Sequence, residues 1–205
     1  MAFGCPFFKQ MVGAGIIPAV MNPQYALVAY VRHPIGEFVQ NLRRDLHPDL
    51  PHLPAHVTIL PPRQLPAGPS EETAAVATLE RMCRDVNPFE IVLGDVETFV
   101  PVTPTVFLRV EHAAYRLREL HDRLGVGSLH SEEQWPYMPH LTIVKMGGEQ
   151  SAMAAFEFAR DRWKQYTGSR RILIDELTFV REAENGSWTD LAAVRLGRSL
   201  VSGKK

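Results

Sequence analysis

The sequence contains little that would place it at once in a specialised class of protein. Its two cysteines, Cys5 and Cys83, lie far apart, and the second falls inside an expected helix. This usage argues against a disulfide framework and favours a reducing compartment, so we expect a cytoplasmic protein. The apolar run at 12–20 is too short to span a membrane and is interrupted by two glycines and a proline, so no membrane partner is expected.

An excess of charge of either sign is also missing. The formal net charge is −1 at pH 7, which argues against a footprint on duplex nucleic acid but leaves room for a local site for one phosphate. Hydrophobic residues make up 45% of the chain and charged residues 22%, as in ordinary globular proteins. A chain of 205 residues can form one substantial domain or a bilobed one, and we expect a monomer.

The two ends of the chain differ from its middle. Lys9 and the run at 12–20 faintly resemble a signal peptide, but no clear cleavage site follows. We expect residues 1–22 to be a flexible extension, or a segment ahead of a natural start at Met21, and residues 199–205 to be a disordered tail. The folded domain is then predicted to span residues 23–198.

What the chain does contain is a short motif that occurs twice. Residues 54–60 read Pro-Ala-His-Val-Thr-Ile-Leu, and residues 138–144 read Met-Pro-His-Leu-Thr-Ile-Val. Both runs are rich in β-branched residues, which predicts strands. Alternate side chains of a strand share a face. We therefore expect an imidazole beside a hydroxyl on one face of each strand, with an apolar face behind, from His56 and Thr58 and from His140 and Thr142.

The same order of elements is predicted around each motif: strand, helix, His-x-Thr strand, helix, strand. In the first half these elements are expected at 25–31, 34–46, 54–60, 70–86 and 89–100. In the second half they are expected at 105–110, 113–124, 138–144, 152–163 and 171–181, before a turn at 185–186 and a closing strand at 188–196. Pro61 and Pro62 are expected to end the first motif strand, and Ser70 to cap the helix that follows.

The repeated order indicates an internal duplication. The similar runs beginning at Asp95 and Asp175 lie at nearly the same separation as the two histidines. The predicted fold is α+β and bilobed, with two pseudo-twofold-related lobes at about 23–103 and 104–198. Each lobe is expected to hold an antiparallel sheet flanked by helices. The pseudo-twofold axis would make the two His-x-Thr strands face each other across a central cleft.

Two imidazoles facing each other suit acid–base catalysis. One can remove a proton from a nucleophile while the other protonates the leaving group, because the pKa of histidine lies near neutrality. Threonine hydroxyls can donate hydrogen bonds to phosphate oxygens and stabilise the charge that develops there. The histidines at 47, 52 and 56 lack a carboxylate or cysteine at ligand spacing, and neither a metal nor another cofactor is expected.

The paired motifs resemble those of the two-histidine (2H) phosphoesterase superfamily, in particular the bacterial branch of 2′-5′ RNA ligases and RNA 2′,3′-cyclic phosphodiesterases. The motifs at 54–60 and 139–145 carry the resemblance, which covers roughly residues 24–197. It implies that His56 and His140 are the acid and base, and that Thr58 and Thr142 bind phosphate. The implied substrate is an RNA 2′,3′-cyclic phosphate end or a related cyclic or 2′-5′ nucleotide, with reverse ligation in some members. The proline pair after the first motif and residues 1–22 depart from the pattern.

Four further residues are candidate substrate contacts. Lys145 follows the second motif, but strand alternation places it opposite His140 unless the strand bulges or ends. Arg63 could curl over the cleft. Trp135 and Tyr137 precede the second motif and could stack on a base, or could equally fill the interface between the lobes.

Two other interpretations of the fold remain open. A non-catalytic module that binds RNA ends or nucleotides would have the same fold. The loss of one motif would favour this interpretation, but both motifs are intact in this sequence. A purely structural duplicated domain would bury both histidines in hydrogen bonds.

Overall fold

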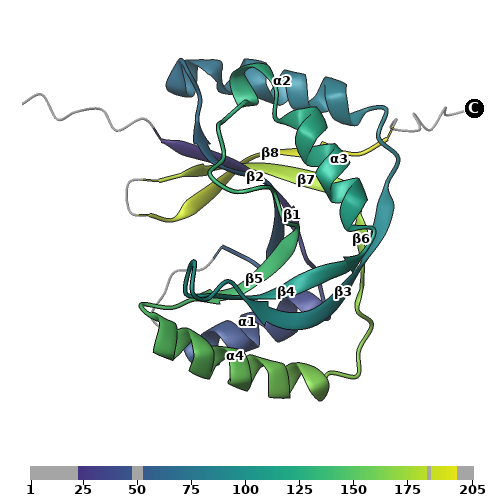
Figure 1. The fold of residues 1–205 in the computed structure, drawn as a ribbon. Helices are drawn as coiled ribbons and strands as arrows, with labels where there is room; N and C mark the ends of the chain where they lie inside the picture. The colour runs from purple at the N-terminus through teal and green to yellow at the C-terminus, as the bar shows by residue number, and fades with distance from the viewer. Residues whose placement is uncertain (1–22, 48–52, 184–185, 198–205) are drawn as a thin grey trace, which may run out of the picture.

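The computed structural model describes residues 23–47, 53–183 and 186–197. The predicted extension at 1–22, the tail at 199–205 and part of the turn at 185–186 lie outside the described residues. The described chain is an α+β fold in which one curled, eight-stranded sheet is flanked by helices (Figure 1). Among the described residues, no helix is both long and apolar enough to cross a membrane.

All strand pairs of the sheet are antiparallel, and its strand order is β6-β3-β4-β5-β2-β1-β7-β8. The strands are β1 (Gln24–Tyr30), β2 (His56–Gln64), β3 (Phe89–Thr98), β4 (Thr105–His112), β5 (His140–Lys145), β6 (Arg171–Ile174), β7 (Glu176–Glu182) and β8 (Trp188–Arg195). The two motif strands, β2 and β5, are neighbours at the centre of this order. The predicted α+β fold is confirmed, and the two motif strands meet as paired neighbours within one sheet.

Helices cover the outer surfaces of the two halves of the sheet (Figure 1). In one half α1 packs on β5 and α4 packs on β3, while in the other α3 packs on β2 and α2 packs on β8. The helices are α1 (Ile35–Leu46), α2 (Glu72–Cys83), α3 (Ala114–Leu124) and α4 (Glu149–Lys164), with short 3-10 helices at Gly68–Glu71 and Gly127–Leu129. Ser70 does not cap α2: its hydroxyl donates to the carbonyl of Ala67, and α2 begins two residues later.

Each half of the sheet takes strands from both halves of the chain. β1 pairs with β7, and β3 pairs with β4, so each repeat contributes one strand to the half of the sheet that contains the other repeat's motif strand. The predicted lobes at 23–103 and 104–198 therefore do not correspond to the two halves of the sheet. The reason is physical: antiparallel partners are chosen by matching of faces in three dimensions, and these partners lie far apart in the sequence.

The strand predicted at 171–181 is in fact two strands that belong to opposite halves. Asp175 separates β6, which pairs with β3, from β7, which pairs with β1. A single residue therefore joins strands at distant places in the strand order, which requires the sheet to curl until those places are close together. This connection lies opposite the open side of the curled sheet in Figure 1.

The proline pair lies within β2, where the sequence predicts the end of the strand. Arg63 pairs with Tyr25 and Leu60 pairs with Leu27, so β2 has one residue more than β1 across this interval. Pro61 and Pro62 lie inside this irregularity. The hydrogen-bond ladder is interrupted there, so the absence of a backbone N–H in proline removes no ladder hydrogen bond. The strand therefore continues through them to Gln64.

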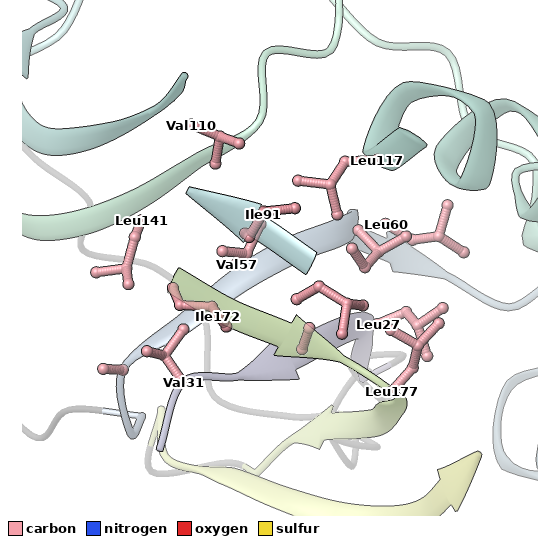
Figure 2. Packing of buried hydrophobic residues seen from close by; sticks show 14 of the residues in the cluster. Leu27, Val31, Val57, Leu60, Ile91, Val110, Leu117, Leu141, Ile172 and Leu177 are labelled. Carbon is pink, nitrogen blue, oxygen red and sulfur yellow. The ribbon is translucent and has the colours of Figure 1, made fainter. Parts of the chain in front are cut away.

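A continuous apolar core runs behind both motif strands. Val57 pairs with Leu141 across the boundary between β2 and β5, and both side chains are fully buried. Figure 2 shows these two residues among neighbours from both halves of the sheet. The labelled members of the cluster in that view are Leu27, Val31, Val57, Leu60, Ile91, Val110, Leu117, Leu141, Ile172 and Leu177.

We expect Leu141→Ala to lower the free energy of unfolding by about 2–5 kcal/mol, because it leaves a cavity where the two halves meet. Urea denaturation followed by circular dichroism would measure this loss. Leu173→Ala is the matched control, since Leu173 is 59% exposed, and its effect should stay within about 0.5 kcal/mol. Equal effects of the two variants would contradict the placement of Leu141.

Candidate active site

The two motifs place four polar side chains on one side of the β2–β5 boundary. His56, Thr58, His140 and Thr142 are each partly exposed, whereas the residues between them are buried in the core. Thr58 and His140 line the same cavity of about 630 Å³, so side chains from both motifs share one space. Among the described residues, no side chain hydrogen-bonds the hydroxyl of Thr58 or Thr142, which leaves both hydroxyls able to contact a ligand.

Both imidazoles are held in the same way by their own strands. Nδ1 of His56 lies 2.7 Å from the carbonyl oxygen of Pro54, and Nδ1 of His140 lies 2.6 Å from that of Met138. A carbonyl oxygen only accepts, so Nδ1 of each neutral ring must carry the proton and donate. The lone pair is then on Nε2, the ring nitrogen that faces away from this bond. Both rings are oriented to accept a proton at Nε2.

The surroundings favour the neutral form of both rings. Burial lowers the pKa of His56 to about 4, and the positive charges of Arg43 and His140 act in the same direction, while the bond to Pro54 opposes them. Burial also lowers the pKa of His140, against a smaller opposing effect of its bond to Met138. Phe99 and Phe107 contribute to this apolar setting, with ring centroids 5.1 and 5.2 Å from the His140 ring.

Each motif strand has a β-bulge directly after its threonine. In β2, Leu60 and Thr58 pair with consecutive residues of β1, so Ile59 is the extra residue. In β5, Val144 and Thr142 pair with consecutive residues of β4, so Ile143 is the extra residue. A bulge interrupts the ladder and leaves the extra residue unpaired. The carbonyl groups of Ile59 and Ile143 therefore need other hydrogen-bond partners.

Helices from the other half of the chain supply these partners. Nε of Arg43 in α1 donates to the carbonyl of Ile143 at 3.0 Å, and Nδ1 of His121 in α3 bonds that of Ile59 at 2.8 Å. Arg43 also donates to the carbonyls of Thr142 and Leu53, both at 2.7 Å. Each motif is thus held in its bulged conformation by a side chain from a helix on its outer surface.

Arg43 adds a charge as well as hydrogen bonds. It is only 4% exposed, and it forms no salt bridge with a carboxylate among the described residues. Burial lowers the pKa of Arg43 to about 10, so the side chain still carries its positive charge at neutral pH. A buried cation close to the site favours any anion that binds between the histidines.

Two of the predicted contact residues, Arg63 and Tyr137, form hydrogen bonds within the protein. Arg63 is 4% exposed and donates to the carbonyls of Pro61 and Leu129 and to the carboxylate of Glu133. Tyr137 donates to the carbonyl of Thr58 at 2.7 Å, and its ring stacks on that of His121 at 4.1 Å. Both line the 630 Å³ cavity, but their polar ends are engaged by the protein.

The other two contact candidates are exposed. Lys145, Thr142 and His140 pair with β4 positions 105, 107 and 109, which alternate and so share one face. The bulge at Ile143 thus returns Lys145 to the face of the motif side chains, whereas an unbroken strand would place it on the opposite face. Trp135 lines the cavity and is 59% exposed.

A family model described as the 2′-5′ RNA ligase superfamily matches residues 31–186. The chain belongs to this superfamily. The matched region contains both motifs and most of the sheet. Membership in this superfamily of 2H phosphoesterases supports a phosphodiesterase-type function.

Curated relatives extend over almost the whole described chain. A protein of Halalkalibacterium halodurans named "Putative phosphoesterase BH1439" is 26% identical over 175 residues, covering 85% of this chain and 98% of its own length. A protein of Oceanobacillus iheyensis named "Putative phosphoesterase OB1230" is 24% identical over 182 residues, covering 85% of this chain and 99% of its own length.

Solved structures share the fold at low sequence identity. Escherichia coli LigT complexed with 3′-AMP superposes with a TM-score of 0.58 at 16% identity, covering 86% of this chain and 99% of LigT. TT0787 of Thermus thermophilus gives 0.58 at 18% identity with the same coverage. Usb1 of Kluyveromyces marxianus gives 0.51 at 12% identity, covering 85% of this chain and 98% of its own.

The sequence patterns did not predict that Arg43 and His121 would contact the motif strands. Each lies four residues after a buried helix position, Val39 in α1 and Leu117 in α3. A polar side chain on the apolar face of a helix was the available signal, because such a side chain needs buried hydrogen-bond partners. Over the described parts of the chain, no cluster of three or more His, Cys, Asp or Glu is arranged to hold a metal.

We expect Arg43→Met to lower the free energy of unfolding by about 2–5 kcal/mol, because it leaves buried carbonyl groups without donors. Arg44→Met is the matched control, since Arg44 is the next residue of α1 and is exposed. Urea denaturation of both variants measures the difference. A loss within about 0.5 kcal/mol for both would contradict the structural role of Arg43.

NMR titration of the histidine rings tests the electrostatics of the site. In the free protein we expect a midpoint near 4 for His56 and a midpoint below 6.5 for His140, since their surroundings disfavour the charged ring. Inorganic phosphate should raise both midpoints, because a bound anion stabilises the imidazolium form. The exposed His33 at the start of α1 is the control and should not respond to phosphate. If phosphate changed the midpoints of His56 and His140 as little as that of His33, the result would contradict a shared anion site.

Proposed function

We propose that the protein is a metal-independent phosphodiesterase that acts on RNA 2′,3′-cyclic phosphate ends or on related small cyclic or 2′-5′ nucleotides. The observation that carries the proposal is the pair of imidazoles at the β2–β5 boundary, each with Nδ1 bonded to a carbonyl and Nε2 available. We assign His56 and His140 as the acid–base pair, in either order, and Thr58 and Thr142 as phosphate ligands.

The proposed reaction is an in-line hydrolysis. One imidazole takes a proton from water at Nε2 while the water oxygen bonds to phosphorus. The bond from phosphorus to one ribose oxygen breaks, and the other histidine, as imidazolium, gives its proton to that oxygen. The product is a phosphate monoester at the other ribose position. The threonine hydroxyls donate to the non-bridging oxygens, where charge accumulates as phosphorus becomes five-coordinate.

The low pKa values of both rings are compatible with this scheme. Base catalysis needs a neutral ring, and burial favours that form of His56 and His140. Acid catalysis needs the second ring to be protonated, and the negative charge of a bound phosphate diester favours that form. Substrate binding would therefore supply part of the driving force that charges the acid.

The comparisons support the class of substrate in coarse terms. LigT, which shares this fold, is described in complexes with phosphate and with 3′-AMP, both of which are small phosphate compounds. Lys145 lies on the face of the motif side chains, and we assign it a contact with a substrate phosphate. 2′-5′ ligation would use the same groups, with a ribose 5′-hydroxyl in place of water. One histidine would take the hydroxyl proton while its oxygen bonds to phosphorus, and the other would protonate the 3′ oxygen as its bond to phosphorus breaks.

Hydrolysis of the four nucleoside 2′,3′-cyclic monophosphates in EDTA tests the proposal. Wild type should turn over at least one of them, and His56→Ala and His140→Ala should each lower kcat by about 10²-fold or more, the usual contribution of a general acid or base. The position of the product phosphate, 2′ or 3′, identifies the oxygen that leaves.

Two controls make the result specific. Circular dichroism of each variant shows whether the fold is retained, and His112→Ala, at the end of β4 and outside both motifs, should keep wild-type turnover. Turnover that depends on neither motif histidine would contradict the assignment. Binding of nucleotides without turnover would instead support a non-catalytic module that binds RNA ends or nucleotides.

A further inference from the structure

Tyr137 connects the two motifs. It lies three residues before His140, in the segment that leads into β5, and its hydroxyl donates to the carbonyl of Thr58 in β2 at 2.7 Å. The next residue, Met138, supplies the carbonyl oxygen that lies 2.6 Å from Nδ1 of His140. One short segment therefore bonds the first motif at one end and orients the histidine of the second motif at the other.

The backbone ladder between the two motif strands is short, which makes this bond important. Within the described residues, the register of β2 with β5 comprises one pair, Val57 with Leu141. Thr58 follows Val57, and directly after Thr58 the ladder of β2 with β1 is interrupted by the bulge at Ile59. The hydroxyl of Tyr137 supplies a further bond to Thr58 at the point where both ladders stop.

The ring of Tyr137 is itself held in place. It stacks on the imidazole of His121 in α3, with ring centroids 4.1 Å apart and an interplanar angle of 4°. Nδ1 of His121 donates to the carbonyl of Ile59 at 2.8 Å, since a carbonyl oxygen only accepts. Two stacked side chains thus bond the consecutive carbonyls of Thr58 and Ile59. Because the stack restricts rotation of the phenol ring, its hydroxyl stays directed at the Thr58 carbonyl.

Glu133 and Arg63 extend this cluster along β2. The carboxylate of Glu133 lies 3.6 Å from Nε2 of His121 and forms a salt bridge of 3.2 Å with Arg63. Arg63 is 4% exposed and donates to the carbonyl of Pro61 at 2.9 Å. Buried polar groups are normally satisfied by hydrogen bonds, and here they satisfy one another and the strand. One connected cluster of side chains therefore bonds the carbonyls at positions 58, 59 and 61.

The second motif has the equivalent carbonyls bonded by a different side chain. Arg43 in α1 donates to the carbonyls of Thr142 and Ile143, at 2.7 and 3.0 Å. These two residues occupy the places in the second motif that Thr58 and Ile59 occupy in the first. Chemically unrelated side chains that bond equivalent atoms indicate that both arrangements stabilise the conformation of the motif threonine.

We propose that Tyr137 is a positioning residue, whose hydroxyl holds Thr58 beside His140 so that the Thr58 hydroxyl meets an oxygen of a phosphate bound between the motifs. The proposal rests on the proposed function, because it takes the phosphate role of Thr58 from there. Tyr137 acts through Thr58 and touches no reacting atom. A small displacement of a group that contacts the phosphate is costly, so a hydroxyl behind the site contributes to its function.

Binding of inorganic phosphate tests this role without any need for turnover. The NMR ring signals of His56 and His140 report the dissociation constant. Thr58→Val removes the hydroxyl and should weaken binding about 10- to 150-fold, the contribution of a hydrogen bond to a charged group. Tyr137→Phe keeps the stacked ring and removes its hydroxyl alone, so it should weaken binding less, about 3- to 10-fold.

The double variant separates positioning from a general loss of structure. If Tyr137 acts through Thr58, adding Tyr137→Phe to Thr58→Val should change the dissociation constant by no more than about twofold. A merely structural contribution would weaken binding by the same factor with and without the Thr58 hydroxyl.

Tyr166→Phe is the matched control, because Tyr166 has the same two kinds of contact outside the site. Its ring stacks on that of Trp163 at 4.9 Å, and its hydroxyl donates to the carbonyl of Ser169 at 3.3 Å, just after the end of α4. This variant should leave phosphate binding unchanged. Circular dichroism of every variant checks that the fold is retained.

Two outcomes would overturn the positioning role alone: no effect of Tyr137→Phe beside a clear loss in Thr58→Val, or an equal effect of Tyr137→Phe in both backgrounds. Wild type that does not bind phosphate, or binding that Thr58→Val leaves unchanged, would overturn the phosphate role of Thr58 in the proposed function and the positioning role with it. The expected cycle without hydrolysis of any cyclic phosphate would support the positioning role in a phosphate-binding protein.

Discussion

The site depends on one contact between the two halves of the sheet, the pairing of β2 with β5. At this boundary Val57 and Leu141 are fully buried opposite each other. The residues on either side of each one in the chain are the histidine and threonine of its motif. Because alternate side chains of a strand point in opposite directions, burying this apolar pair forces four polar side chains to the other surface, next to one another. The hydrophobic core thus positions the polar site.

The two motifs have similar backbone geometry, but the charges around them differ. Both motifs carry a bulge after the threonine, and in both the freed carbonyl is bonded by a helix side chain, a guanidinium at position 43 and an imidazole at position 121. Burial is the main cause that lowers the pKa of His56, and the charge of Arg43 adds to it. No matching effect of His121 acts on His140, whose pKa is lowered by burial. The charge around the two rings is therefore unequal, because the guanidinium of Arg43 acts on His56.

The parts of this arrangement that depend on local pattern could be predicted from the sequence. The alternation of polar and apolar residues in each motif was sufficient to predict which side chains share a face, and the repeated order of elements was sufficient to predict the pseudo-twofold axis. The bulges at Ile59 and Ile143 leave no mark in that pattern, so the placement of Lys145 could not be decided. The partners of β3, β6 and β7 depend on contacts between distant residues, which is why the predicted lobes differ from the halves of the sheet.

The exchange of strands between the halves has a consequence for how a duplicated chain of this kind could arise. A polypeptide made of one repeat would contain β1, α1, β2, α2 and β3, but β1 would lack the strand that pairs with it as β7 does here. Its own β3 would lack a β4. A second copy could supply both, with the two motif strands meeting at the twofold axis. A single repeat would therefore complete its sheet only with a second copy of itself, and the presence of both repeats in one chain makes the paired motif strands independent of protein concentration.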